Sequence, residues 1–393
     1  MWMAPGLLHT QGWERMENFP GAGRDDGICF RIEGSAYCGT GLKVGWTPSR
    51  NFFAYDLKKG SWKGAKALPK DEERQYASGF SHDGLGYVFG GSRNGSFLKD
   101  LWRYDPERAS WKAMTPLPAK GRSGTASFCI GDKAYIIGGK TEDKAALREV
   151  WAYDMSTNEW EEKGKLPFGG RWRASAAAVD GRGYLLFGAD KDGNKHRQVY
   201  AYHPEQDRWK KVSTFPGKGR SYSRSEAVRG KLMIIAGSEG SNGFLNDTWR
   251  FNPRTEEWEE LKGLPIAGRR GGMSFSDCST LYYSTGLDTN KNRTRGTWKY
   301  PVIHKEKRIP NKIRCYPNPV EKRFIVIVGK GLLSDRGELT LFEPSGSLIH
   351  QSKIECVRTE LDLSGLANGV YLLRYKAGGS IARKKILKVG GGR

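Results

Sequence analysis

The sequence predicts an all-β fold built from a repeated unit of about fifty residues. Tryptophans recur at a fixed interval of 49 residues, as Trp13, Trp62, Trp111, Trp160, Trp209 and Trp258. The residues around them also recur, as in VWAYDMSTNEWEEKGKLP (150–167) and TWRFNPRTEEWEELKGLP (248–265). The 52 glycines among 393 residues favour many turns and few long helices. Such a period is typical of a β-propeller in which one repeat forms one four-stranded blade.

Each repeat supplies four strands. GRSGTASFCIGDKAYIIGG (121–139) contains a Gly-Arg pair, a strand of small residues, a turn with glycine, and an apolar strand ending in Gly-Gly. The third strand carries two aromatic residues two positions apart, which places both on one face. These two aromatic ladders are Phe53, Trp102, Trp151, Tyr200, Trp249 and Trp298, and Tyr55, Tyr104, Tyr153, Tyr202, Phe251 and Tyr300. Turn formers such as Asp105-Pro106 lead to the fourth strand, which contains the repeated tryptophan.

Together these motifs resemble the kelch repeat over residues 13 to about 300. The double glycine is present at Gly90-Gly91 and Gly138-Gly139, and it is reduced to Gly188-Ala189 and Ala236-Gly237. The resemblance implies a kelch β-propeller, whose blades surround a central channel.

The two ends of the repeat region predict six blades. The sixth repeat continues through Trp298 and Tyr300, but Lys307 stands where its last tryptophan is due. Trp13 and Phe19-Pro20 precede the first complete repeat and form an unpaired fourth strand. We therefore expect residues 11–302 to form a six-bladed propeller in which residues 11–20 complete the last blade, leaving no free sheet edge.

A second domain follows the propeller. Residues 303–314 are basic, contain Pro310 and predict a linker. Residues 315–393 lack the 49-residue period, and their alternating segments, such as Phe324–Val328 and Val370–Tyr375, predict a small β-sandwich.

The second domain resembles the type A C-terminal sorting domain of the type IX secretion system of Bacteroidota. The resemblance rests on Tyr316-Pro317-Asn318-Pro319, on LFEPSGSLI (341–349), on LDLSGLANGVYLL (361–373), which contains Gly369 and Tyr371, and on Lys384-Lys385. It implies that the secretion machinery recognises this domain and exports the protein through the periplasm to the outer surface or the medium. A complete signal peptide is not recognisable at the start of the given chain.

Charge and composition predict an anionic partner. The formal net charge is +22, from 65 basic and 43 acidic residues. Such a charge attracts acidic glycans, anionic surfaces or nucleic acid. Nucleic-acid binding rests on charge alone, without a recognised motif, and is not expected. No apolar run is long enough to span a membrane, and we expect a monomeric propeller.

Cysteines and histidines predict a disulfide and no metal site. Neither residue type shows a spacing typical of metal ligands, so we expect no metal and no cofactor. Cys29 and Cys38 lie at equal distances from the turn at Glu33-Gly34, which places them opposite each other on a hairpin. They can form a disulfide in an oxidising compartment.

The Gly-Arg pairs predict a basic channel mouth. The loops between blades and the loops after Gly-Gly fall on the same rim of an up-and-down propeller. The repeated arginines are Arg24, Arg74, Arg122, Arg171, Arg220 and Arg269, with Arg270 adjacent to the last. The second set of loops adds Arg93, Lys140, Lys191, Lys195, His196, Lys291, Arg293 and Arg295. A concave mouth of one charge sign concentrates anions. Alternatively, an arginine repeated in every blade is structural and bonds carbonyl groups of the adjacent blade.

Residues that break the repeat are stronger candidates for a binding site. The fourth blade has Trp172 and Arg173 where the third has Ser123 and Gly124. The fifth blade places Tyr222, Arg224 and Glu226 at alternate positions, on one face of its innermost strand. An aromatic ring, arginines and a carboxylate suit a sugar site. Glu226 occupies a position that is apolar in other blades, so it is either ion-paired with Arg224 or Arg173, hydrated, or functional.

The leading functional hypothesis is a secreted or surface-displayed propeller that binds an anionic ligand, in particular an acidic glycan, at the arginine-rich mouth. The first alternative is a sugar epimerase or mutarotase similar to bacterial sialate epimerases, with Glu226 as acid/base and Arg224, Arg173 or Arg220 holding a carboxylate. The second alternative is an extracellular scaffold for protein–protein interactions. The sequence contains no GxSxG, HExxH or P-loop motif, so binding is favoured over catalysis.

Overall fold

The computed structural model describes residues 12–143, 146–302, 313–328, 337–354, 358–363, 365–377 and 380–390. The chain forms two compact units, residues 1–302 and residues 303–393. Of the expected linker, residues 303–312 lie outside the described residues, and 313 and 314 begin the first strand of the second unit. Apart from one 3-10 turn, η1 (Pro204–Gln206), the regular elements of the described residues are strands. The described part of the chain contains no helix long and apolar enough to cross a membrane.

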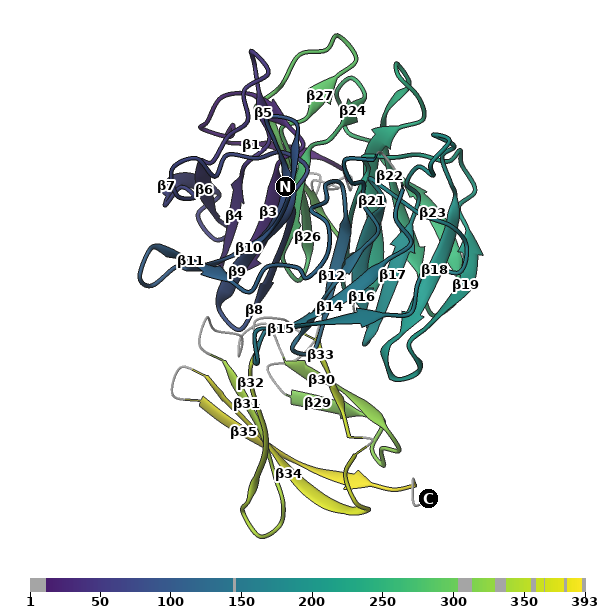
Figure 1. Ribbon diagram of the computed structural model, residues 1–393. Helices are drawn as coiled ribbons and strands as arrows, with labels where there is room; N and C mark the ends of the chain where they lie inside the picture. The colour runs from purple at the N-terminus through teal and green to yellow at the C-terminus, as the bar shows by residue number, and fades with distance from the viewer. Residues whose placement is uncertain are drawn as a thin grey trace, which may run out of the picture. The chain divides into compact units, whose positions relative to one another are not determined.

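The first unit is a propeller of six antiparallel four-stranded blades (Figure 1). The first strands of the blades, β3, β8, β12, β16, β20 and β25, contact one another in a closed ring. Blades one to three are β3 (Ile28–Ile32), β4 (Ser35–Gly39), β6 (Phe52–Asp56) and β7 (Ser61–Ala65); β8 (Ser78–His82), β9 (Leu85–Arg93), β10 (Ser96–Asp105) and β11 (Ser110–Met114); and β12 (Ala126–Ile130), β13 (Lys133–Ile137), β14 (Val150–Asp154) and β15 (Glu159–Lys163).

The remaining blades repeat this order, and Figure 1 shows β16 to β19 following one another from the centre outward. Blades four and five are β16 (Ser175–Val179), β17 (Arg182–Leu186), β18 (Gln198–His203) and β19 (Arg208–Thr214); and β20 (Arg224–Val228), β21 (Lys231–Ser238), β22 (Phe244–Asn252) and β23 (Glu257–Leu261). Blade six is β25 (Met273–Ser276), β26 (Thr280–Ser284), β28 (Thr297–Pro301) and β1 (Glu14–Met16).

The N-terminal strand closes the propeller, as the sequence predicts. β1 pairs with β28 in antiparallel register, from Glu14 opposite Lys299 to Met16 opposite Thr297. Trp13 is buried beside Tyr300, with ring centroids 5.4 Å apart, and its Nε1 donates a hydrogen bond to Thr248 of blade five. The first and last parts of the propeller sequence therefore share one sheet.

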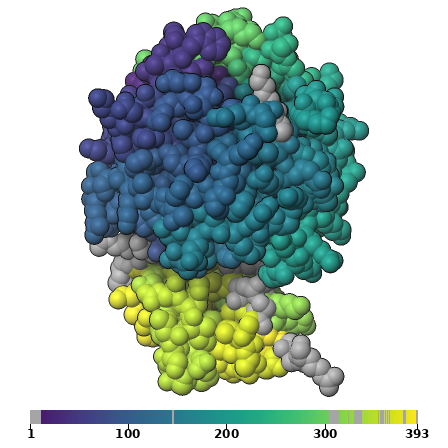
Figure 2. Space-filling view, viewed as in Figure 1, coloured from purple at the N-terminus to yellow at the C-terminus, as the bar shows by residue number. Residues whose placement is uncertain are grey.

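The tryptophan ladder joins neighbouring blades. Five of the six repeated tryptophans lie directly opposite the second aromatic residue of the third strand in the same blade. The pairs are Tyr55–Trp62, Tyr104–Trp111, Tyr153–Trp160, Tyr202–Trp209 and Phe251–Trp258. The Nε1 atoms of Trp62, Trp111 and Trp160 donate hydrogen bonds to carbonyl groups that follow the outer strand of the preceding blade. The space-filling view shows the blue and teal blades packed against one another on the face turned to the viewer (Figure 2). The ladder is therefore structural.

Two consecutive residues with positive φ follow the apolar part of every second strand. They are Thr40-Gly41, Gly90-Gly91, Gly138-Gly139, Phe187-Gly188, Ala236-Gly237 and Thr285-Gly286. The expected pair Gly188-Ala189 is therefore wrong by one residue, because Phe187 takes the left-handed conformation. A Cβ atom on Gly91 would lie 2.6 Å from a backbone oxygen, so the second position requires glycine, whereas the first accepts a side chain.

The predicted disulfide between Cys29 and Cys38 is present. The two residues are paired directly across the hairpin of β3 and β4, with Cα atoms 4.2 Å apart. Such a bond persists in oxidising compartments, which agrees with an exported protein.

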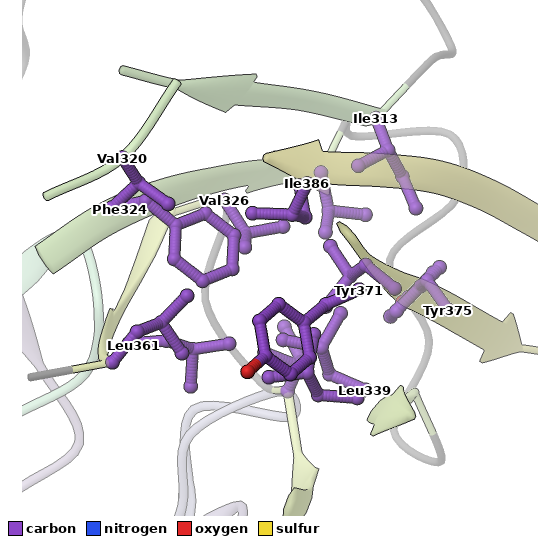
Figure 3. Close-up of a cluster of buried hydrophobic side chains, with 14 of the residues drawn as sticks. Ile313, Val320, Phe324, Val326, Leu339, Leu361, Tyr371, Tyr375 and Ile386 are labelled. Carbon is purple, nitrogen blue, oxygen red and sulfur yellow. The ribbon is translucent and has the colours of Figure 1, made fainter. Parts of the chain in front are cut away.

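The second unit is a β-sandwich. One sheet contains β29 (Ile313–Tyr316), β30 (Arg323–Val328) and β33 (Arg358–Asp362), and the other contains β32 (Leu348–Lys353), β31 (Glu338–Phe342), β34 (Gly369–Ala377) and β35 (Ser380–Lys388). Apolar side chains from both sheets form its core, including Phe324, Val326, Leu339 and Tyr375 (Figure 3). This arrangement confirms the predicted sandwich.

The predicted sorting-signal residues have distinct places in this sandwich. Tyr316-Pro317 and Asn318-Pro319 are cis peptides, and the Asn318 side chain bonds the backbone of β35 at Lys385 and Leu387. Tyr371 is buried in the core and donates a hydrogen bond to the Ala367 carbonyl group. Gly369 begins β34, whereas Lys384 and Lys385 are exposed on β35. Asn318 thus fixes the start of the domain to its last strand.

Candidate functional site

Two kinds of loop meet at one end of the propeller, which we call the rim. In every blade a residue before the first strand forms an antiparallel bridge with a residue near the end of the second strand; the pairs are Asp25–Leu42, Gln75–Ser92, Ser123–Lys140, Trp172–Ala189, Ser221–Ser238 and Arg270–Leu287. β2 (Arg24–Asp25) belongs to the first of these bridges. Figure 1 shows β5 (Leu42–Lys43), β24 (Arg269–Arg270) and β27 (Leu287–Asp288) together at this end.

The repeated arginines do not line an open mouth. Each exposes 9% of its surface or less; they are Arg24, Arg74, Arg122, Arg171, Arg220 and Arg269. Arg24 donates a hydrogen bond to the Thr40 carbonyl group at 2.9 Å, and Arg171 to the Gly170 carbonyl group at 2.8 Å. Because these guanidinium groups are enclosed, the expectation that they contact a ligand is corrected. They are structural, but the carbonyl groups that they bond belong to their own blade and not to the adjacent blade.

In three blades a carboxylate completes the arginine site. Asp100, Glu149 and Asp247 accept hydrogen bonds from Arg74, Arg122 and Arg220, at 2.8, 2.7 and 2.7 Å. Each carboxylate also accepts a hydrogen bond from the tryptophan two residues later in the third strand. The other blades have Asn51, Gln198 and Gly296 at this position. The repeated arginines are therefore part of the internal framework.

A closed ring of six backbone hydrogen bonds surrounds the propeller axis at the rim. The residue two positions after each repeated arginine has positive φ and donates its N–H to the carbonyl group of its equivalent in the preceding blade. The ring consists of Asp26, Tyr76, Gly124, Arg173, Tyr222 and Gly271, with N–O distances from 2.6 to 3.3 Å. The left-handed conformation is costly for residues with side chains, so this ring holds a strained backbone in place.

The side chains of this axial ring pack across the axis. Tyr76 and Tyr222 come from opposite blades, and their ring centroids are 6.4 Å apart. The Arg173 guanidinium carbon lies 4.4 Å from the Tyr76 ring and 4.0 Å from the Tyr222 ring. Glycine leaves the necessary space, because a Cβ atom on Gly124 would lie 3.2 Å from Arg173 and one on Gly271 would lie 2.5 Å from Asp26. The axis therefore ends at the rim in an aromatic and basic cluster.

The Arg173 guanidinium is stacked among aromatic rings. Its guanidinium carbon is also 3.8 Å from the Trp172 ring centroid, and Lys140 lies over the same tryptophan at 4.8 Å. Within the described residues no group accepts a hydrogen bond from this guanidinium, and its Nε atom is enclosed without a partner. Burial lowers the pKa of Arg173 from its usual value. A stacked guanidinium with unused donors is suited to a carboxylate, sulfate or phosphate.

Arg270 extends the cluster towards blade six. It lies over Tyr222 at 4.4 Å and over Phe244 at 5.6 Å, and its nitrogens are 3.5 Å from the carboxylates of Asp25 and Asp26. Both carboxylates are at least 97% buried, as their exposed fractions are 1% and 3%. The cluster thus combines cations with two enclosed acids.

Asp26 titrates near neutrality in this setting. Burial, and next the neighbouring Asp25 carboxylate, raise the pKa of Asp26 to about 7, although Arg270 and Arg173 oppose the rise. Tyr76, Arg224 and Tyr283 also interact electrostatically with this carboxylate. The charge of the rim therefore changes between pH 6 and 8.

Arg224 and Glu226 line a cavity of about 420 Å³ that is enclosed by the six first strands. Arg224 donates hydrogen bonds to the carbonyl groups of Gly272 and Gly27, at 2.5 and 2.7 Å. The Glu226 carboxylate accepts hydrogen bonds from Ser274 and Ser276, at 2.6 and 3.2 Å. Burial raises the pKa of Glu226, and these hydroxyl groups oppose the rise. The hydroxyl groups of two serines hold this carboxylate, and an ion pair with Arg224 or Arg173, one of the three alternatives for Glu226, is not formed.

Of the candidates that break the repeat, the structure places Trp172, Arg173 and Tyr222 in one cluster with Arg270, and Arg224 and Glu226 in the cavity. Three further members of the cluster are not predicted from the sequence. These are Tyr76, Asp25 and Asp26. The position two residues after each repeated arginine carries the available signal, since it is glycine in blades three and six and a large or charged residue in the other four. Within the described residues no three His, Cys, Asp or Glu side chains are grouped as a metal site.

Comparison with known families matches residues 20–165 and 116–286 to the KLHDC2/KLHL20/DRC7 Kelch-repeats domain. Residues 314–389 match the secretion system C-terminal sorting domain. Among solved structures, one titled "Structure of YjhT" is similar with a TM-score of 0.62 at 19% identity, covering 72% of this chain and 96% of that one. The search of curated proteins gave no match. The sorting domain indicates export to the cell surface or the extracellular space. The chain therefore belongs to the kelch-repeat family and ends in a secretion sorting domain.

Proposed function

We propose that the exported propeller binds an anionic ligand, an acidic glycan, at the rim. The observation that carries this proposal is the Arg173 guanidinium, which is stacked among Tyr76, Trp172 and Tyr222 without a hydrogen-bond acceptor in the described part of the chain. Arginine presents its donors in a planar fork that matches a carboxylate or sulfate. Stacking on three rings fixes the fork before the ligand arrives, which reduces the entropy lost on binding.

The surroundings favour an anion that carries a sugar ring. Lys140, Arg173 and Arg270 supply positive charge at the rim, and the chain as a whole has a net charge of +22. Aromatic rings offer flat apolar faces against which the C–H face of a sugar can pack. Acidic glycans are also present outside the cell, where the sorting domain directs the protein.

Binding is preferred over the epimerase or mutarotase alternative. In that alternative Glu226 is the acid/base, but both of its oxygens are engaged by Ser274 and Ser276. Arg224, the expected carboxylate clamp, is engaged by two backbone carbonyl groups. The scaffold alternative requires a protein partner, and in the described part of the propeller only two large apolar side chains, Val44 and Trp46, are exposed to support one. We therefore assign the proposed ligand to the rim cluster and no reaction to the cavity.

Replacing Arg173 with glutamine is expected to weaken binding of an acidic oligosaccharide about 10-fold to 100-fold, since a charge-assisted hydrogen bond contributes roughly 1.5–3 kcal/mol. Binders are first selected on an array of uronate, sialylated, sulfated and neutral oligosaccharides, and affinities are then measured by calorimetry. Arg108→Gln is the matched control, because this 83% exposed side chain lies in the turn between β10 and β11. Equal affinities of the two variants, or selection of neutral sugars only, contradict the proposal.

Affinity for a uronate oligosaccharide is expected to fall roughly threefold to tenfold as pH rises from 6 to 8. Ionisation of Asp26, with its pKa of about 7, places a negative charge beside Arg173 and Arg270 and weakens their attraction for an anion. The ligand carboxylates remain ionised throughout this range. Asp26→Asn should remove most of the pH dependence. An unchanged pH profile in this variant excludes Asp26 as the titrating group.

The same ionisation affects stability with a defined sign. An ordinary aspartate ionises near pH 4, so between about pH 4 and 7 the folded chain binds more protons at Asp26 than the unfolded chain does. The contribution of Asp26 to the free energy of unfolding therefore falls as pH rises through this window. As pH rises through this interval, the melting temperature of Asp26→Asn should rise relative to that of the wild type. This measurement checks the pKa of Asp26 without a ligand.

A further inference from the structure

The rim cluster continues beyond Arg173 as a strip of alternating cations and aromatic rings. From Arg173 it passes through Tyr222 at 4.0 Å and Arg270 at 4.4 Å. Arg270 then lies near Asp25, whose Oδ1 atom accepts a hydrogen bond from Arg293 Nε at 2.6 Å. Arg293 in turn lies over the ring of Trp46 at 4.6 Å. The strip therefore joins blades four, five, six and one along the rim.

Trp46 is an unusual end to this strip. Its exposed fraction is 77%, although large aromatic side chains are mostly buried. It lies in the loop after β5 with a φ of 60°, which is unfavourable for a bulky residue, and the hydrogen bond from Lys43 N to the Thr47 carbonyl group closes this loop. Arg293 packs on one face of its ring. A tryptophan held in this way presents a flat apolar surface to solvent.

The strip carries more positive charge than one acidic group of a ligand would neutralise. Arg173, Arg270 and Arg293 follow one another, Lys140 lies over Trp172 at the blade-three end, and Lys291 lies over Phe244 at 4.4 Å. Of these cations, Arg270 and Arg293 contact the carboxylates of Asp25 and Asp26, and Asp26 is protonated in part at neutral pH. Lys291 donates hydrogen bonds to the Ser241 carbonyl group and to Asn242 Oδ1. A ligand with one negative charge would neutralise only the Arg173 end.

We propose that the rim accommodates a glycan chain with several acidic residues, in which one acidic group binds at Arg173 and a sugar ring further along the same chain stacks on Trp46. This inference rests on the proposed function and specifies its ligand as a polyanionic oligosaccharide instead of a single acidic sugar. A chain fits because the cations are distributed along several blades, whereas one sugar can reach only one end of the strip. Stacking on Trp46 gives the chain a direction and adds affinity that charge alone does not supply.

The test compares D-galacturonic acid with its α-1,4-linked hexamer by calorimetry. The wild type is expected to bind the hexamer at least tenfold more tightly than the monomer. Trp46→Ala should lose about fivefold to tenfold of the affinity for the hexamer and none of that for the monomer, and Trp46→Phe should restore most of the loss. Arg173→Gln should lower the affinity for both the monomer and the hexamer. Because Trp46 is exposed, its variants should keep the wild-type melting temperature, which is measured as a check on folding.

Each other outcome has a defined meaning. Equal affinities for monomer and hexamer, with no effect of Trp46→Ala, overturn the extended site and leave a single-sugar site at Arg173. If neither probe binds, the extended site for a uronate chain is overturned. The proposed function is overturned as well if no sialylated or sulfated oligosaccharide of the array binds. A single-stranded oligothymidylate of the same charge serves as a further ligand. If it binds as tightly as the hexamer and responds equally to Trp46→Ala, the strip recognises charge and flat rings in general, which contradicts a glycan site.

Discussion

A chain that begins at Gly21 is expected to lose the cooperative unfolding of its propeller. The removed segment contains β1, the fourth strand of blade six, and its loss exposes the edge of β28. It also contains Trp13 and Phe19, which expose 9% and 0% of their surfaces. Truncation of one large buried aromatic residue typically costs roughly 3–5 kcal/mol, and the whole stability of a domain is about 5–15 kcal/mol. The combined loss is therefore comparable with the total.

The segment also joins blade six to blade one, which enlarges the effect. Phe19 packs against Phe53 and Trp62, with ring centroids 5.0 and 5.2 Å apart, and Arg24 lies over it at 4.7 Å. Glu17 accepts the hydrogen bond from Trp62 Nε1. Circular dichroism melting and limited proteolysis should show a broad, early transition and rapid cleavage. Trp13→Ala alone should lower the melting temperature by roughly 5–15 °C. A truncated chain that melts sharply at the wild-type temperature would contradict this role.

The closure of the propeller by the N-terminal strand could be predicted from the sequence because it follows from the spacing of the repeated tryptophans. A strand position recurs every 49 residues, so the missing tryptophan at Lys307 and the extra Trp13 identify the same strand. Backbone conformation was less accessible. Phe187 takes a positive φ at a position that is glycine only in blades two and three, because the backbone conformation, and not the residue type, is repeated. Aligning the glycines therefore placed the positive-φ pair of blade four at Gly188-Ala189 instead of Phe187-Gly188.

The site was predicted in part for a similar reason. Arg173 and Tyr222 were found because they break the 49-residue repeat. Tyr76 was missed because it lies 50 residues after Asp26 and 48 before Gly124, so a strict ladder places Gln75 in its column. The burial of the repeated arginines could not be predicted from the sequence either. An arginine that recurs in every blade gives the same sequence pattern whether its guanidinium contacts a ligand or a buried carboxylate. Only the contacts of Arg220 and Arg173 separate the two cases.

Replacing Arg220 with leucine is expected to destabilise the propeller by roughly 3–5 kcal/mol, the usual cost of breaking a buried ion pair from one side. Arg220 donates to both oxygens of Asp247, at 2.7 and 2.8 Å, and to the Ala236 carbonyl group at 3.2 Å. Its side chain is 2% exposed and that of Asp247 is 20% exposed. In the variant the Asp247 carboxylate keeps only the hydrogen bond from Trp249 and remains charged in a poorly hydrated position. Chemical denaturation monitored by tryptophan fluorescence measures the loss.

Arg171→Leu is the matched comparison, because Arg171 occupies the same column in blade four but has Gln198 in place of the carboxylate. It should cost less, about 1–2 kcal/mol, since no unpaired charge remains. Adding Asp247→Leu to Arg220→Leu should recover part of the loss for the same reason. Both arginine variants should bind an acidic oligosaccharide as tightly as the wild type wherever they remain folded. If either variant instead loses affinity at full stability, the repeated arginines contact the ligand, and the division between a buried framework and a binding cluster at Arg173 is wrong.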